Sequence, residues 1–260
     1  MGRSLLNGLI NNGFLRENLI AVEVDEDKRQ QLKQEFGINV AGKMRGVVAL
    51  ADIVILAVKP QTMKDAVTAL MSELSSCRPL LISIAAGVSL DSLAMWSAPD
   101  FAIIRAMPNT PALVNQAATA ICTNSRVSET QVNFATGILS AVGKVVKVQD
   151  ENMIDVVTAL SGSGPAYFFY LLEIMEKTAI KLGLDADSAR QLSQQTAFGA
   201  ASMALQSRLE PEELRKQVTS PGGTTEAALK VMSKHNFAEV LGEAMTAAMQ
   251  RSKELSQNQK

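Results

Sequence analysis

The stretch Ile53-Val54-Ile55-Leu56-Ala57-Val58 is an unbroken apolar run with the length of one β-strand. Two more largely apolar runs of strand length follow, at Leu80–Ile84 and Ala102–Met107, and a helical pattern that starts with Pro60 separates the first two. Continuously apolar strands that alternate with helices are typical of a parallel sheet covered on both faces. The sequence therefore predicts an α/β fold with a Rossmann-like, doubly wound, mostly parallel sheet.

The same alternation extends to both sides of these three runs. Further strands are predicted at Leu19–Val24, Ala118–Cys122 and Lys144–Val148. Further helices are predicted at residues 3–12, 26–36 and 129–142, and Asp25 is placed to cap the second of them. The first half of the chain is therefore predicted to form one α/β domain, over residues 1–149.

From Asp150 onward the strand pattern is absent, and residues 150–260 are predicted to form a second, all-helical domain. Its helices are predicted at residues 152–160, 165–182, 185–206, 210–218, 224–234 and 236–255. They are rich in alanine and glycine, so each buries little on its own and needs close helical partners. The polar residues 252–260 are predicted to form a frayed tail.

Composition narrows the possible functions. The chain has 25 basic and 26 acidic residues, a balance that gives no electrostatic field for nucleic acid or an anionic membrane. No apolar run reaches the length of a membrane span, and no leader pattern opens the chain, so we expect a cytoplasmic protein. Cys77 and Cys122 lack metal-ligand spacing and are expected to be reduced and structural. His235 is the single histidine, which excludes histidine-based triads and metal sites.

Residues 219–228 have the pattern of a helix N-terminus stripped of bulky side chains. Pro221 ends the preceding segment, two glycines bare the backbone, and Thr224 or Thr225 is placed to cap the next helix. Free N–H groups and the positive end of the helix dipole favour an anion at such an end. We expect a small carboxylic acid there, with a threonine hydroxyl beside it.

Five motifs in order and spacing, spread over nearly the whole chain, resemble those of pyrroline-5-carboxylate reductases. They are AVKP at residues 57–60, SIAAGV at 83–88, RAMPNTPALV at 105–114, SGSGPAY at 161–167 and TSPGGTTEAA at 219–228. The resemblance implies reduction of 1-pyrroline-5-carboxylate to L-proline, the last step of proline biosynthesis, with NADPH or NADH. It also implies a dinucleotide-binding domain at 1–149 and an all-helical dimerisation and substrate domain at 150–260. The expected assembly is a homodimer, in some relatives built into larger rings.

The resemblance assigns the cofactor to loops at the carboxyl ends of the strands, where open parallel sheets bind ligands. The residues expected to contact it are Gly2, Glu23, Ala57, Val58, Lys59, Pro60, Ile84, Ala85, Ala86, Asn109 and Gln217. Glu23 stands near a strand end where an acid accepts hydrogen bonds from the adenosine ribose and repels a 2′-phosphate. We therefore expect a weaker preference for NADPH than is common in the family, with NADH as the alternative.

The resemblance assigns the imino acid to Glu151, Gly223, Thr224 and Thr225. The substrate carboxylate is expected on the N–H groups that follow the glycines, and Thr225 is expected to hold the ring nitrogen. Reduction of a C=N bond needs a hydride donor, orientation and one proton, but no nucleophile or metal. Thr225 is a poor acid, so its expected role is orientation and relay of a proton from water.

The glycine fingerprint of the family is incomplete here. Met1-Gly2 resembles its last two positions, so we expect the first strand and two leading glycines, roughly a dozen residues, to be missing from this chain. In the doubly wound order that strand lies centrally, between Leu19–Val24 and Ile53–Val58. We expect this chain to bind dinucleotide poorly while its helical domain still dimerises.

Two other functions fit the same residues. A reductase of the same architecture could act on a six-membered cyclic imine, because ring size depends on pocket volume. A catalytically silent relative could use its helical domain for assembly alone, although the intact turn at Ser220–Thr225 argues against this.

Overall fold

The computed structural model describes residues 1–74 and 77–257, which form two compact units. The first unit comprises Met1–Ser163 and the C-terminal segment from Ala247, and the second is Gly164–Thr246. Residues 151–163 and the last turns of the chain thus pack with the α/β unit, and not with the helices that the sequence grouped them with. The helix that contains Ala247 begins in the second unit and ends in the first.

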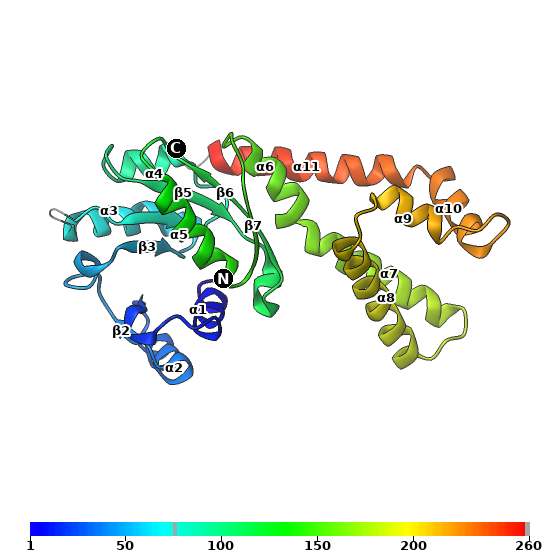
Figure 1. The fold of residues 1–260 in the computed structure, drawn as a ribbon, viewed down its shortest axis with the longest axis horizontal. Coiled ribbons are helices and arrows are strands. Elements are labelled where there is room, and N and C mark those ends of the chain that lie inside the picture. Colours follow the sequence, from blue (N-terminus) through cyan, green and yellow to red (C-terminus); the bar gives the residue numbers. More distant parts are fainter. Residues whose placement is uncertain (75–76, 258–260) are drawn as a thin grey trace. The chain divides into compact units, whose positions relative to one another are not determined.

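The first unit is built on a five-stranded sheet in the order β3-β4-β5-β6-β7 (Figure 1). Its strands are β3 Ile53–Leu56, β4 Leu80–Ser83, β5 Ile103–Met107, β6 Ala117–Thr123 and β7 Gly143–Lys147. All neighbours are parallel except β5 and β6, which are antiparallel. The predicted Rossmann-like, mostly parallel sheet is confirmed.

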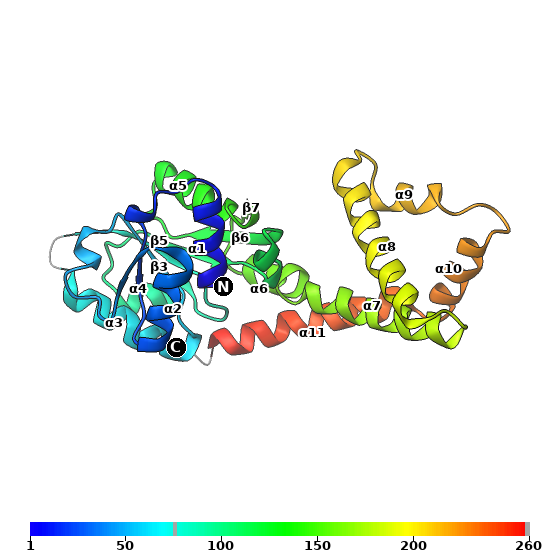
Figure 2. The same ribbon diagram turned by 90° about the horizontal axis from the view of Figure 1, so that it is seen from below.

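Helices cover both faces of this sheet (Figures 1 and 2). On one face lie α1 (Gly2–Asn11) and α5 (Glu129–Ser140), whose leucines pack on Ile82, Ile104 and Ile121. On the other lie α3 (Met63–Glu73), α4 (Leu90–Trp96) and α6 (Met153–Val157), which pack on Leu81 and Ile103. The apolar run Leu80–Ile82 of β4 follows from this, because every residue of the strand is buried. Helix α4 was not predicted.

Two short parallel strands, β1 (Ile20–Val22) and β2 (Asn39–Ala41), form a separate sheet. Helix α2 (Glu26–Phe36) connects them, and Asp25 caps it as predicted by accepting a hydrogen bond from the Lys28 N–H at 3.1 Å. Strand β2 was not predicted. Because β1 pairs only with β2, and β3 only with β4, each of these two strands has one edge unpaired within the described residues.

Short helical turns complete the first unit. The 3₁₀ turns are Arg16–Asn18, Val48–Leu50, Pro60–Thr62 and Thr110–Val114, and a π-helical turn spans Thr158–Gly162. The π turn overlaps the end of the helix predicted at 152–160 and the start of the gap before the helix predicted at 165–182. A Cβ on Gly162 would lie 2.6 Å from Met107 Cε, the flexible end of a side chain on β5, so a larger residue here would require that side chain to move.

The second unit is entirely helical within the described residues. Its helices are α7 (Gly164–Lys181), α8 (Ala186–Gln206), α9 (Pro211–Gln217), α10 (Thr224–Lys234) and the first part of α11 (Phe237–Gln257). Helices α7 and α8 lie side by side (Figure 1). Large apolar side chains stay exposed on them, among them Phe168, Phe169 and Phe198. A unit with so little core of its own offers a broad apolar face for association.

The C-terminal segment differs from its prediction. Instead of fraying after Ser252, α11 continues to Gln257, and Ser252 is only 5% exposed. Its hydroxyl donates a hydrogen bond of 2.7 Å to Asp155 Oδ1 on α6. For residues 252–257 the prediction of a frayed tail was wrong, because polar composition does not reveal that one serine of the segment has a buried carboxylate to bond; residues 258–260 lie outside the described residues.

Candidate active site

The loops after β3 and β4 lie next to each other at the carboxyl end of the sheet. The strands pair in parallel with Leu56 opposite Ser83, and the Ile84 N–H donates to the Leu56 carbonyl at 3.3 Å. The structure therefore brings Ala57–Pro60 and Ile84–Ala86 together, in the position that ligands occupy in such sheets. Val58 and Lys59 are exposed, so the first loop offers backbone and two free side chains.

The first turn of α1 lies against the same edge. A Cβ on Gly2 would be 3.3 Å from Ala57 Cβ, a close approach that a larger residue would disturb. Helix α1 has no side-chain cap and no acidic residue in its first turn. Its first N–H groups and its positive dipole end are thus available to an anion such as a phosphate.

Asn109 follows β5 and is buried. Its side-chain amide donates to the Ser161 carbonyl at 2.9 Å, and its Oδ1 accepts from the Ala118 N–H at 2.9 Å. The side chain thus ties the strand end to the π turn and to β6. What Asn109 offers a ligand at this edge is its backbone.

Glu23 stands directly after β1, as predicted, and its side chain is half-buried. Its Oε1 accepts a hydrogen bond from the Asp25 N–H at 3.1 Å, which fixes the carboxylate at the strand end. Arg29 donates to the carbonyls of Glu23 and Val24, both at 2.8 Å, and pairs with Glu26. Arg29 therefore stabilises the loop between β1 and α2.

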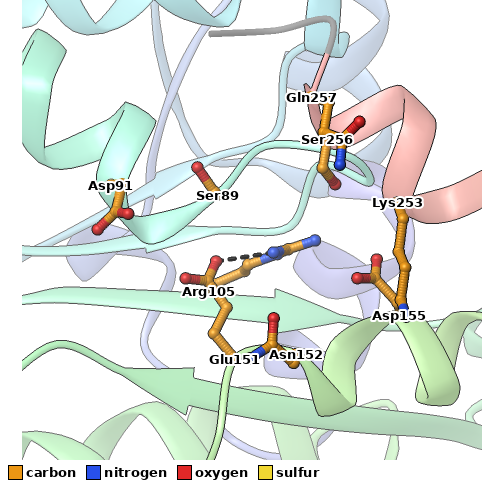
Figure 3. Close-up of a pocket in the computed structure, with 9 residues that line it drawn as sticks. All are labelled: Ser89, Asp91, Arg105, Glu151, Asn152, Asp155, Lys253, Ser256 and Gln257. Carbon is orange, nitrogen blue, oxygen red and sulfur yellow. Dashed lines mark hydrogen bonds and ion pairs between the residues drawn. The ribbon is translucent and has the colours of Figure 1, made fainter.

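Glu151 lies in a polar pocket of the first unit (Figure 3). Its Oε1 accepts two hydrogen bonds of 2.7 Å, one from Arg105 Nη1 and one from the Leu90 N–H at the start of α4. The Arg105 side chain is 5% exposed. Glu151 therefore links β5, α4 and the segment before α6. Sequence reasoning singled out Glu151 but missed Arg105, although a lone charge inside the apolar run 102–107 was a usable signal.

The predicted carboxylate turn lies in the second unit. Gly222 has φ +71°, and Gly223 is the N-cap of α10 with no side-chain cap bond. The prediction that Thr224 or Thr225 caps the helix was wrong, because the two threonines are its first residues. The first N–H groups of α10 thus remain open to an anion, with both hydroxyls beside them. Gln217, the last residue of α9, is exposed.

Neither an activated thiol at Cys122 nor a cluster of metal-binding side chains occurs in the described part of the chain. Burial raises the pKa of the Cys122 thiol, the nearby Glu151 charge adds to this, and the thiol stays protonated. Both cysteines are free thiols, as predicted. No group of three metal-binding side chains occurs among the residues that the structure describes. Within the same residues, no helix has the length and apolarity that crossing a membrane requires.

Comparison with known proteins adds two family matches. Residues 151–255 match the family described as pyrroline-5-carboxylate reductase dimerisation, and residues 1–87 match NADP oxidoreductase coenzyme F420-dependent. The first match begins one residue after the start of the second predicted domain. It supports assembly of the chain into an oligomer.

Whole-chain relatives agree with these matches. A pyrroline-5-carboxylate reductase of Pseudomonas aeruginosa is 45% identical over 99% of this chain and 94% of its own length. The structure of one from Coxiella burnetii is 41% identical, with a TM-score of 0.94, over 98% of this chain and 94% of that one. The Plasmodium falciparum pyrroline carboxylate reductase with NADP bound is 28% identical, with a TM-score of 0.86 and the same coverage.

Proposed function

The chain belongs to the pyrroline-5-carboxylate reductase family, and from this premise we propose that it reduces 1-pyrroline-5-carboxylate to L-proline with NADPH or NADH. The observation that carries the proposal is identity of 45% over nearly the whole chain, with the glycine-threonine turn intact at the start of α10. Its place is the last step of proline biosynthesis.

The residues at the carboxyl end of the sheet fit a dinucleotide. The supporting observation is the close approach of Gly2 to Ala57, where the uncapped start of α1 meets a loop without bulky side chains. We assign Ala57–Pro60, Ile84–Ala86 and the Asn109 backbone to the same cofactor, with Glu23 toward its ribose and Gln217 as a contact from α9. When bound, the reduced nicotinamide supplies a hydride.

The turn before α10 is assigned to the imino acid. Its carboxylate is held by the N–H groups after Gly223, which have no intrahelical acceptor. The Thr225 hydroxyl accepts or donates at the ring nitrogen and relays a proton from water, because a threonine itself is too weak an acid. Thr224 and Glu151 complete the proposed substrate residues. Glu151 acts with Oε2, because its Oε1 already accepts two hydrogen bonds.

The assembly proposed is a homodimer formed through the helices after Asp150, with larger oligomers open. The exposed aromatic side chains of α7 and α8 support it, because a monomer would leave them in water. We propose that residues 1–149 bind the cofactor and that residues 150–260 provide dimerisation and substrate binding. Two free thiols and a balanced charge favour a cytoplasmic location, with no nucleic-acid or membrane partner.

A single assay tests the reaction. Purified full chain is mixed with NADH or NADPH and either the five-membered or the six-membered cyclic imino acid, and nicotinamide oxidation and product are followed. We expect proline from the five-membered substrate at a much higher kcat/KM than turnover of the six-membered one. A higher kcat/KM for the six-membered imino acid would make that compound the substrate in place of 1-pyrroline-5-carboxylate. If neither imino acid is turned over with either cofactor, the chain is a catalytically silent assembly protein.

A further inference from the structure

A pocket of about 320 Å³ lies in the first unit, between the start of α4, strand β5, helix α6 and the end of α11 (Figure 3). It is lined by polar side chains: Ser89, Asp91, Arg105, Glu151, Asn152, Asp155, Lys253, Ser256 and Gln257. Apart from Glu151, none of them is among the residues assigned above to cofactor or imino acid. Its volume admits several waters or one small organic molecule.

Arg105 forms one wall of this pocket with donors to spare. The residue is 4% exposed, and within the described residues only Nη1 has a partner, the Glu151 carboxylate. Figure 3 shows the guanidinium turning its other end away from Glu151, toward the side of the pocket where Asp155 and Lys253 lie. The other guanidinium nitrogens are not among the buried atoms that lack a partner, so they are accessible from the pocket, and the partner that a guanidinium prefers is a carboxylate.

The opposite wall holds the complementary charge. Asp155 is buried, and within the described residues only its Oδ1 has a hydrogen-bond partner, the Ser252 hydroxyl. The Ser256 Oγ is buried and has no hydrogen-bond partner in the described residues. Arg105 and Asp155 both line the pocket, and within the described residues no ion pair joins them. A molecule bound between them would meet a positively charged hydrogen-bond donor on one side and a carboxylate on the other.

We propose that this pocket binds a small zwitterionic α-amino or α-imino acid. The ligand carboxylate accepts from the free Arg105 nitrogens and from Ser256, and its ammonium group donates to Asp155. With the Arg105–Glu151 pair set aside, the remaining charged residues of the lining are Lys253, Asp91 and Asp155, so carboxylates outnumber cations and a simple anion is disfavoured. The inference is argued from residues of the first unit alone, and Glu151 is the one lining residue that it shares with the proposed substrate residues.

The test is calorimetric titration of the full chain with four probes. L-Alanine and L-proline carry both charges, whereas acetate and methylammonium carry one each. We expect both amino acids to bind at least tenfold more tightly than either single-charge probe. Equal binding of acetate would make the pocket a simple anion site, and absence of binding by all four would leave it to water. Either result overturns the proposal.

Variants locate the bound molecule. Asp155→Asn keeps an oxygen for Ser252 but removes the charge, and Ser256→Ala removes the orphan hydroxyl. We expect each to weaken L-alanine binding at least fivefold. Lys216→Gln on α9 is the surface control, and both it and Thr225→Ala should leave L-alanine binding unchanged. L-Alanine binding that is lost in Thr225→Ala and kept in Asp155→Asn would place the amino acid at the turn and overturn the pocket.

Discussion

Arg105 and Glu151 form a hydrogen-bonded ion pair of 2.7 Å between strand β5 and the segment before α6, although they are 46 positions apart in the chain. The arginine side chain is 5% exposed and the glutamate side chain 26%. The same glutamate oxygen also holds the Leu90 N–H at the start of α4. One pair therefore fixes three elements around the edge of the sheet.

Glu151→Gln is expected to destabilise the fold more than Arg105→Met. The glutamine oxygen still accepts from Leu90 and Arg105, but the guanidinium, only 5% exposed, is left without a counter-charge, which costs about 3–5 kcal/mol. The methionine leaves a carboxylate that is 26% exposed and still accepts from the Leu90 N–H, so that loss is about 1–3 kcal/mol. Urea unfolding of both variants and of the double mutant gives the coupling energy. Additive effects in the double mutant would show that the pair contributes nothing beyond its separate contacts.

Thr225→Ala is expected to lower kcat/KM for the imino acid by roughly 10- to 100-fold, as for loss of one hydrogen bond to a charged group. Its stability should stay within about 0.5 kcal/mol of the parent, because Gly223, and not this threonine, is the cap of α10. Thr225→Ser, which keeps the hydroxyl, is the control and should retain most activity. If steady-state kinetics gave the alanine variant the same kcat/KM as the parent chain, Thr225 would not be part of the substrate site.

Gly223→Ala is expected to distort the carboxylate turn by a clash. An added Cβ would lie 2.5 Å from Ser220 Oγ and 3.0 Å from its carbonyl oxygen, at a cost of about 1–3 kcal/mol. Substrate KM should rise with it. Combining the change with Ser220→Ala should recover part of both losses, because the hydroxyl is the nearer obstacle.

Gly222→Ala provides the matched comparison for this clash. An added Cβ there meets open space, but φ is +71°, so the cost of about 1–2 kcal/mol comes from the backbone. Ser220→Ala should give no recovery in that background. Equal recovery for both glycines, measured by thermal unfolding, would contradict the steric account.

Sequence patterns predicted the helices and strands that are long enough to show a regular apolar spacing. Helix α10 spans Thr224–Lys234 as expected from the turn before it and its regular apolar spacing. Strand β2, three residues long, and α4, seven residues long, are too short for a periodic pattern to register. Their place depends on neighbours in the sheet.

The candidate site also has one part that the sequence predicts and another part that it does not. The loops after β3 and β4 could be predicted, because parallel strands always leave the sheet at one edge. The pairing of Arg105 with Glu151 could not, because nothing near either residue in the sequence specifies the other. The cap of α10 was assigned one or two residues too late, since a Gly-Gly-Thr-Thr sequence admits either glycine or threonine as the cap.

Glu23→Ser is expected to raise the ratio of kcat/KM for NADPH to that for NADH by roughly tenfold. Its carboxylate is fixed at the end of β1 by the Asp25 N–H, and removing it relieves repulsion of a 2′-phosphate worth about 1–2 kcal/mol. Glu17→Gln, at an exposed acid away from the strand end, is the control for net charge. An unchanged cofactor ratio in the serine variant would mean that Glu23 does not face the ribose.

Ser252→Ala should loosen the end of α11, whereas Ser256→Ala, one turn later, should not. Ser252 donates to the buried Asp155 carboxylate at 2.7 Å, so its removal leaves a charged acceptor unsatisfied and costs about 1.5–3 kcal/mol. Ser256 Oγ is buried without a partner in the described residues, so its removal without ligand is expected to be neutral or slightly stabilising. Amide hydrogen exchange over residues 247–257 checks both, with faster exchange expected only for Ser252→Ala. Equal protection in the two variants would show that apolar packing, such as Leu255 against Gly87, holds this helix end without the hydrogen bond.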